Sequence, residues 1–257
     1  MSLFRGLRVL YCAAIFAGTA AIMFLTPESP AWLHPVLIVL WVLLVFAAFE
    51  GIAFARLKRA NDLLDNCRCR DYIDYWERML PRARRTNAFT VKLNLSAGYL
   101  EMGRPQRARE LLDSLPPIPE KPRYASYRLV NDNNRVVCSR MLDRLDEADA
   151  QLSLYRTHLA AVSPKLAKRS RIDTLCEMQT VLQRMARGDF DGAIPYFEGR
   201  LRDAPALRGR VAAHYDLAWA LHHEGRIDEA RDHLALAAAN GGDTWYATAA
   251  KRKLETL

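Results

Sequence analysis

Residues 217–242 read LAWALHHEGRIDEARDHLALAAANGG and carry the clearest structural signal in the chain. Apolar side chains recur three and four positions apart on both sides of Gly225, which is the spacing of the buried face of a helix. Glycine can end a helix in the left-handed conformation. Five residues later, Ala230 is small enough to let a second helix approach the first closely. The stretch therefore predicts two helices joined by a tight turn.

The same frame recurs upstream, with Gly103, Asp143 and Gly188 at the turn position. The small residue after each turn is an alanine, at positions 108, 148, 193 and 230. Residues 71–81 fit the second helix of a degenerate leading pair, whose first helix would run through residues 57–66. One pair cannot bury its apolar face alone, so the pattern predicts helix pairs stacked into an all-α solenoid.

This pattern resembles the tetratricopeptide repeat family over roughly residues 65–240, most closely in residues 217–242. The resemblance implies a protein-binding solenoid in which the first helix of each pair lines the concave face. Carried over by position, that face would include Leu93, Ala97, Leu100, Val137 and Leu182, together with the partner-groove candidates. Those candidates are Asn133, Arg140, Met178, Met185, Tyr215, Trp219 and His222. The alternative is that these side chains only pack inside a tightly wound solenoid.

The first fifty-five residues differ sharply from the rest because they are nearly all apolar. Two runs, at about 9–25 and 33–55, are long enough to cross the hydrocarbon core of a membrane as helices. The short linker between them predicts a two-helix transmembrane hairpin. Arg5 and Arg8 before the first run also suit a cleaved signal peptide, and that alternative stays open.

Charge placement predicts the orientation of the hairpin. Arg56, Lys58 and Arg59 follow the second run, whereas the linker has no Lys or Arg. The positive-inside rule then places both termini in the cytoplasm, at a plasma (inner) membrane, with these three side chains near anionic lipid. The expected domains are the hairpin, 1–55, and a cytoplasmic solenoid, 56–257, that ends in a capping helix after residue 243.

Motifs for catalysis, cofactors and metals are missing from the sequence. It has no Walker loop, nucleophile elbow or dinucleotide fingerprint, so we expect no enzyme activity and no cofactor. Cys67 and Cys69 form a single C-x-C, which is too little for a zinc site. The four histidines of residues 214–233 lack a carboxylate at metal-site spacing. A net charge of +8 without aromatic residues between the basic ones does not favour nucleic-acid binding.

Two basic clusters, Arg82 to Arg85 and residues 165–171, suit solvated helix ends or a surface for an anionic partner. Taken together, the sequence predicts a membrane-anchored adaptor or scaffold whose helical-repeat groove binds a protein or peptide. The alternative is a structural or self-associating component of a membrane complex, without a peptide groove.

Overall fold

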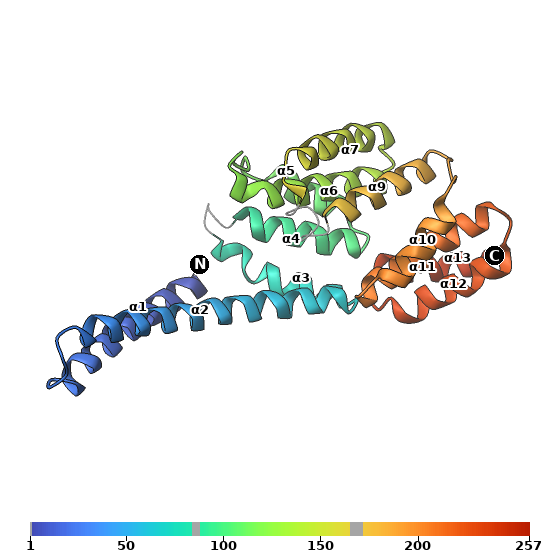
Figure 1. The fold of residues 1–257 in the computed structure, drawn as a ribbon. Coiled ribbons are helices and arrows are strands. Elements are labelled where there is room, and N and C mark those ends of the chain that lie inside the picture. Colours follow the sequence, from blue (N-terminus) through green and yellow to red (C-terminus); the bar gives the residue numbers. More distant parts are fainter. Residues whose placement is uncertain (1, 84–87, 165–171) are drawn as a thin grey trace. The chain divides into compact units, whose positions relative to one another are not determined.

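A computed structural model describes residues 2–83, 88–164 and 172–257, and over these residues it contains helices and no strands. Figure 1 shows their order along the chain. Most of both basic clusters, residues 84–85 and 165–171, lies outside the described residues. The helices are α1 (Ser2–Leu25), α2 (Leu33–Asp65), α3 (Cys69–Glu77), η1 (Leu80–Arg82), α4 (Ala88–Glu101), α5 (Pro105–Asp113), η2 (Pro122–Tyr124), α6 (Ala125–Met141), α7 (Leu145–Ala160), α9 (Ile172–Ala186), α10 (Ala193–Asp203), α11 (Leu207–His223), α12 (Ile227–Asn240) and α13 (Trp245–Leu254).

The chain forms two compact units, Met1–Asn61 and Asp62–Leu257, and the boundary between them falls inside α2. In the first unit α1 and α2 pack together as a hairpin. The indole N–H of Trp41 donates to the carbonyl of Ala14 at 3.1 Å, and a Cβ on Gly18 would collide with the Trp41 ring. By length and composition α2 could cross a membrane, whereas the apolar part of α1, Val9–Leu25, is shorter.

The second unit is a solenoid of helix pairs whose turns share one geometry. Each turn has a residue with positive φ, between 57° and 87°, and the N–H after it donates to the carbonyl five residues back, as in Arg226 to Leu221. These turn residues are Cys67, Gly103, Asp143, Gly188 and Gly225. Four of them stand where the repeat pattern predicts. The fifth, Cys67, joins the end of α2 to α3 and completes the degenerate leading pair.

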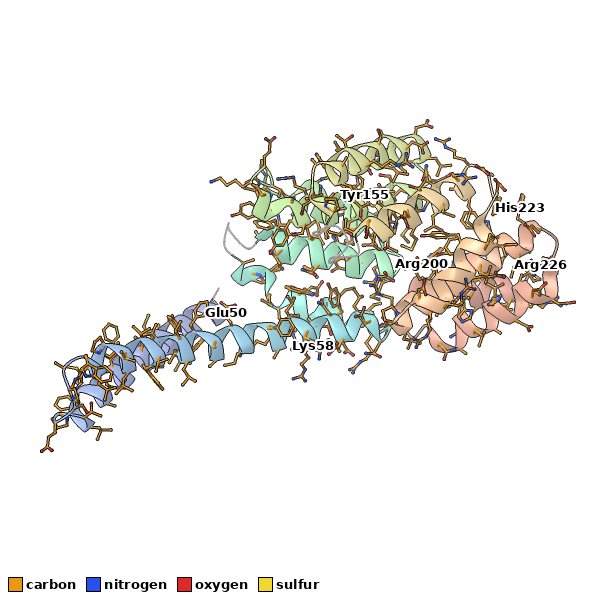
Figure 2. All side chains as sticks on the ribbon, viewed as in Figure 1. Glu50, Lys58, Tyr155, Arg200, His223 and Arg226 are labelled. Carbon is orange, nitrogen blue, oxygen red and sulfur yellow. The ribbon has the colours of Figure 1, made fainter. Side chains whose placement is uncertain are left out.

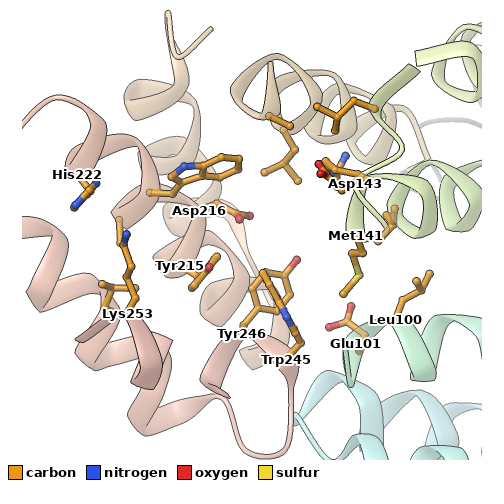
Figure 3. Close-up of a pocket in the computed structure, with 18 residues that line it drawn as sticks. Leu100, Glu101, Met141, Asp143, Tyr215, Asp216, His222, Trp245, Tyr246 and Lys253 are labelled. Atoms are coloured by element: carbon orange, nitrogen blue, oxygen red, sulfur yellow. The ribbon is translucent and has the colours of Figure 1, made fainter. Parts of the chain in front are cut away.

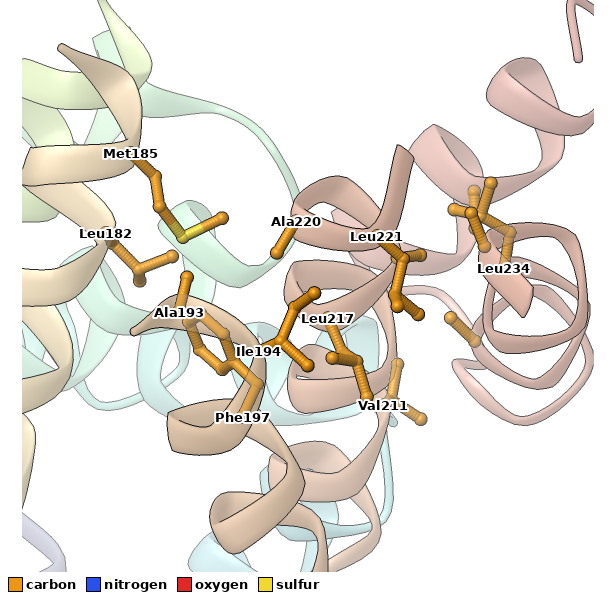
Figure 4. Close-up of a cluster of buried hydrophobic side chains, with 14 of the residues drawn as sticks. Leu182, Met185, Ala193, Ile194, Phe197, Val211, Leu217, Ala220, Leu221 and Leu234 are labelled. Atoms are coloured by element: carbon orange, nitrogen blue, oxygen red, sulfur yellow. The ribbon is translucent and has the colours of Figure 1, made fainter. Parts of the chain in front are cut away.

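The alanine after each later turn is fully buried, as close helix approach requires. Ala108, Ala148, Ala193 and Ala230 all have 0% exposure. Around them, leucines and aromatic residues fill the space between pairs, and Figure 4 shows the C-terminal part of this core. There, Met185 of α9, Phe197 of α10, Leu221 of α11 and Leu234 of α12 belong to one buried cluster.

The first helix of each pair stacks regularly on the first helix of the next pair in only one part of the solenoid. α4 packs on α6, and α6 packs on α9. The next first helix, α11, packs instead against α10, α12 and α13, and the described residues show no comparable packing of α9 against α11. The interrupted stacking leaves room for a pocket, which is described below.

The two ends of the solenoid are joined to each other. The Asp243 side chain, between α12 and α13, accepts hydrogen bonds from the backbone N–H groups of Cys69 at 2.6 Å and Arg70 at 2.8 Å. It thereby caps α3, which begins 174 residues earlier in the chain. Trp245 of α13 covers Gly103, where a Cβ would come within 2.4 Å of the indole ring. α13 lies in the segment where a C-terminal capping helix is expected, and its Ala247 and Ala250 are buried.

Candidate ligand-binding chamber

A pocket of about 520 Å³, partly open to solvent, lies among the helices of the solenoid, and we call it the chamber. Helices from both ends of the second unit line it, as the close-up in Figure 3 shows. Its residues are Leu100, Glu101, Val137, Arg140, Met141, Asp143, Leu145, Leu182, Ala186, Tyr215, Asp216, Ala218, Trp219, His222, Leu234, Trp245, Tyr246 and Lys253. Spaces of this size accommodate small molecules, and most of the chamber's wall is apolar or aromatic.

Four of the predicted groove residues line this chamber, namely Arg140, Tyr215, Trp219 and His222. Three others do not. Met185 is 1% exposed and belongs to the core beneath α9 and α11, and Met178 packs against the same core. Asn133 of α6 donates to the neighbouring Asn134 and lies outside the chamber lining. Helical spacing places Met185 on the groove stripe, but its side chain packs among the buried residues of α10 and α11 instead.

Arg140 reaches the chamber from the last turn of α6. Its Nη2 donates to the side-chain oxygen of Gln179 on α9 at 2.6 Å, and Gln179 carries no charge. Its Nη1 is buried and has no hydrogen-bond partner within the described ranges. Burial lowers the pKa of this guanidinium, and the charges of Tyr246 and Asp216 oppose that effect. The chamber therefore holds a cation without a bonded anion.

Asp216 projects from the middle of α11 and is only 4% exposed. Figure 3 shows its carboxylate directed toward the space between α11 and α6. Its Oδ2 has no hydrogen-bond partner among the residues that the structure describes. Burial raises the pKa of Asp216 to about 7, the charge of Glu101 adds to the rise, and Arg140 opposes it.

Glu101, a half-buried carboxylate in the same lining, has an ion-pair partner, although its Oε2 has no hydrogen-bond partner among the described residues. Arg208 at the start of α11 donates to Glu101 at 2.6 Å and lies 3.6 Å from Asp65 at the end of α2. The attraction of Glu101 is the largest influence on Arg208 and raises the pKa of its guanidinium. This ion pair fastens the end of α4 to α11. Arg140 and Asp216 are left as the unpaired charges facing the deep part of the chamber.

Aromatic side chains form an accessible group beside the chamber, and we call it the aromatic rim. Trp219 lines the chamber and is 36% exposed. Phe190 packs edge-on against it with ring centroids 5.5 Å apart, and His223 stacks on Phe190 at 3.8 Å. The aromatic rim therefore consists of Phe190, Trp219 and His223. Tyr215 lies deeper, against Trp245 and Tyr246 of α13.

The cysteines and histidines form no metal-binding group within the described ranges. Cys67 and Cys69 are buried at the junction of the two solenoid ends, and burial raises the pKa of the Cys67 thiol to about 11. His214 and His233 bond to each other, with Nδ1 atoms 2.8 Å apart. His222 lines the chamber away from that pair.

Sequence reasoning missed Asp216, Tyr246 and Phe190. The repeat frame placed Tyr215 and Trp219 on the concave face, and Asp216 follows Tyr215 directly. A charged residue within the apolar run of α11 is a usable signal, because aspartate is rarely buried without a partner. Tyr246 could not be found from the frame, because its position depends on the contact between the two solenoid ends.

Comparison with known proteins identifies one region of the chain. Residues 184–254 match the family model described as tetratricopeptide repeat. The matched residues run from the end of α9 to the end of α13 and include both the aromatic rim and Asp216. No curated protein and no solved structure matches the chain.

Proposed function

We propose, from the match of residues 184–254 to the tetratricopeptide repeat family model, that the protein is a membrane-anchored adaptor. Domains of this family generally act as scaffolds that bind other proteins. In this proposal the N-terminal hairpin holds the solenoid at a membrane, and a protein partner docks on the aromatic rim. The observation that carries the proposal is an exposed tryptophan supported by Phe190 and His223 in the family's repeat region.

Exposed apolar side chains on both helices support the anchor. Phe16 and Phe24 of α1 are 75% and 83% exposed, and Leu44 of α2 is 62% exposed. An apolar surface of this extent is stable in water only when something covers it. We infer that lipid covers it and that α1 and α2 both cross the membrane.

The charge distribution supports an inner-membrane protein with both termini in the cytoplasm. Arg56, Lys58 and Arg59 are all exposed on α2, and Figure 2 shows Lys58 projecting from that helix. Each such cation near an anionic leaflet contributes about 1 kcal/mol of attraction. Glu50 is also exposed and lies shortly before Arg56 on α2. In this proposal its carboxylate therefore reaches the lipid headgroups.

The aromatic rim has the features of a protein-binding hot spot. Tryptophan is the most enriched residue type in such spots because its large rigid surface loses little entropy on binding. The edge-on contact with Phe190 already fixes the orientation of the Trp219 ring. A partner that buries this ring therefore gains the hydrophobic contribution without first ordering the side chain.

The test is affinity capture of the tagged protein from detergent-solubilised native membranes. Wild type is compared with a Trp219→Ala/His223→Ala variant by quantitative mass spectrometry. Leu236→Ala is the matched control, because Leu236 is also exposed, at 44%, but lies on α12 outside the chamber and the aromatic rim. We expect one partner to be captured by wild type and by Leu236→Ala and to be lost with the rim variant.

Equal capture by all three proteins would refute docking on the rim. The interaction would then lie on the outer face of the solenoid or on the hairpin, as in a structural or self-associating component of a membrane complex. Tyr215 is left unchanged in this experiment, because it packs against Trp245 and Tyr246 and its removal would disturb the closure of the solenoid.

A further inference from the structure

The deep part of the chamber has charges that the adaptor function does not use. Arg140 enters from α6 and Asp216 from α11, so they belong to the two parts of the solenoid between which the stacking is interrupted. Each influences the pKa of the other, yet no ion pair joins them among the described residues. Each also keeps a buried polar atom without a hydrogen-bond partner in the part of the chain that the structure describes.

Leaving these two groups unpaired is costly. A buried donor or acceptor without a partner loses its hydrogen bonds to water and gains none in return, and a charged group loses more than a neutral one. Other charged residues in the lining do not relieve this cost. Glu101 is bound to Arg208, whereas Asp143 and Lys253 are exposed. Two opposite charges that line one cavity without forming an ion pair are complementary to a molecule that carries one charge of each sign.

The other residues that line the chamber indicate the chemistry of the uncharged part of such a molecule. Leu100, Val137, Met141 and Leu182 line the chamber together with Tyr215 and Trp219. Burial of an apolar or aromatic group against these side chains is favourable because it removes apolar surface from water. The hydroxyl of Tyr246 also belongs to the lining.

The size of the chamber favours a small ligand over a long peptide. The contacts of Asp243 with Cys69 and Arg70 join the ends of the solenoid, and Trp245 and Tyr246 of α13 line one part of the chamber. A volume of about 520 Å³ is within the range for small-molecule sites and leaves little room for an extended chain of many residues.

We propose that the chamber binds a free α-amino acid with an apolar or aromatic side chain. Its carboxylate accepts hydrogen bonds from Arg140, its ammonium group donates to Asp216, and its side chain packs against the Tyr215 and Trp219 wall. The ligand bridges α6 and α11 and holds the two parts of the solenoid together. This inference concerns a small molecule and does not depend on the protein partner proposed above.

The test is isothermal titration of the purified full chain in detergent micelles. The probes are L-phenylalanine, L-leucine and L-methionine, each with its two analogues that lack either the amino group or the carboxyl group. For phenylalanine these analogues are 3-phenylpropionate and phenethylamine. We expect saturable binding of at least one amino acid, with an affinity at least tenfold higher than that of either analogue.

Two variants test which residue binds the ammonium group of the ligand and which binds its carboxylate. Asp216→Asn should remove the preference for phenylalanine over 3-phenylpropionate, and Arg140→Met should remove the preference over phenethylamine. Asp228→Asn is the control, because the Asp228 side chain is 99% exposed on α12. Because burial raises the pKa of Asp216 to about 7, wild-type affinity should also increase from pH 6 to pH 8, and Asp216→Asn should not show this increase.

Three results would overturn the proposal. The first is the absence of saturable binding for every amino acid tested. The second is binding that both analogues match or that neither variant changes, which would place the ligand elsewhere. The third is equal binding of N-acetyl-L-phenylalanine amide, which has no charged ends and would identify the occupant as a peptide. The analogue series uses wild-type protein only, so it stays decisive if a variant fails to fold.

Discussion

The two units of this chain expose opposite kinds of surface. In the hairpin, apolar side chains such as Phe16 and Leu44 point outward, and the Trp41 N–H is bonded inward to Ala14. In the solenoid, only Leu154, Trp219 and Leu236 are exposed large apolar side chains among the described residues, while Arg140 and Asp216 are charged and turned inward. We propose that lipid covers the hairpin surface and that a ligand with two opposite charges occupies the chamber. The comparison then assigns one binding requirement to each unit.

The largest effect is expected from placing charge on the hairpin. A Leu40→Asp/Leu44→Asp variant puts two carboxylates at exposed positions near the middle of the apolar part of α2. Each costs about 2.5–3.5 kcal/mol at the centre of a membrane helix. We expect the variant to move from the membrane pellet to the supernatant after carbonate extraction. Leu154→Asp/Leu236→Asp, with the same charges on exposed solenoid positions, should stay in the pellet; if both variants stay, lipid does not cover α2.

The second effect concerns the closure of the solenoid. Asp243→Ala removes the acceptor for the N–H groups of Cys69 and Arg70, so the cost should be about 2 kcal/mol. For a unit of this size that corresponds to a decrease in Tm of about 4–8 °C, measured by circular dichroism of the full chain in micelles. Asp228→Ala, at an almost fully exposed side chain, should leave Tm unchanged. Equal Tm values for both variants would show that the two ends are not joined in solution.

Much of the fold could be predicted from the sequence because the information is local. Gly103, Gly188 and Gly225 mark the turns, and the alanine five residues after each lies at a close helix contact with 0% exposure. Asp143 takes the same left-handed conformation, as aspartate does more readily than most residues. Cys67 was not recognised as a turn residue, because nothing about cysteine favours a positive φ.

The candidate site was harder to predict because it depends on long-range contacts. The repeat frame placed Arg140, Tyr215, Trp219 and His222 on the face that lines the chamber. It could not indicate that Asp243 would cap α3, since the two segments lie 174 residues apart. Trp245 and Tyr246, which follow Asp243 in the chain, line the chamber, and no part of the repeat frame places them there. A frame fitted to regular stacking also cannot show where the stacking is interrupted.

Alanine substitutions at two glycines separate the effect of the contact between the solenoid ends from the effect of backbone strain at a turn. Gly103 and Gly188 both have positive φ, so alanine at either position costs about 1 kcal/mol in backbone strain. Only at Gly103 would the new Cβ also meet a neighbour, the Trp245 ring at 2.4 Å, while nothing lies within 4 Å at Gly188. We therefore expect Gly103→Ala to lower Tm by about 3 °C more than Gly188→Ala. Equal decreases would mean that Trp245 does not cover Gly103.

The smallest expected effect is a pH dependence of stability that comes from one histidine on α11 and one on α12. Burial lowers the pKa of both His214 and His233 below 6.5; His233 and Arg210 add to the effect at His214, while Asp232, Glu229 and Glu198 oppose it at His233. Their Nδ1 atoms share one hydrogen bond, so one ring must donate and the other accept, which a doubly protonated pair cannot do.

The sign of this dependence follows from proton uptake. As pH falls through 6.5, the unfolded chain binds protons at both histidines before the folded chain does, so the free energy of unfolding decreases. We expect Tm of wild type to fall between pH 7 and pH 5.5 by about 2 °C more than Tm of His233→Asn, which has lost one titrating ring. Asp132 and Asp216, whose pKa values burial raises, act in the opposite direction but equally in both proteins, so their effect cancels in the difference. A larger fall in the variant would show that the two rings are not paired.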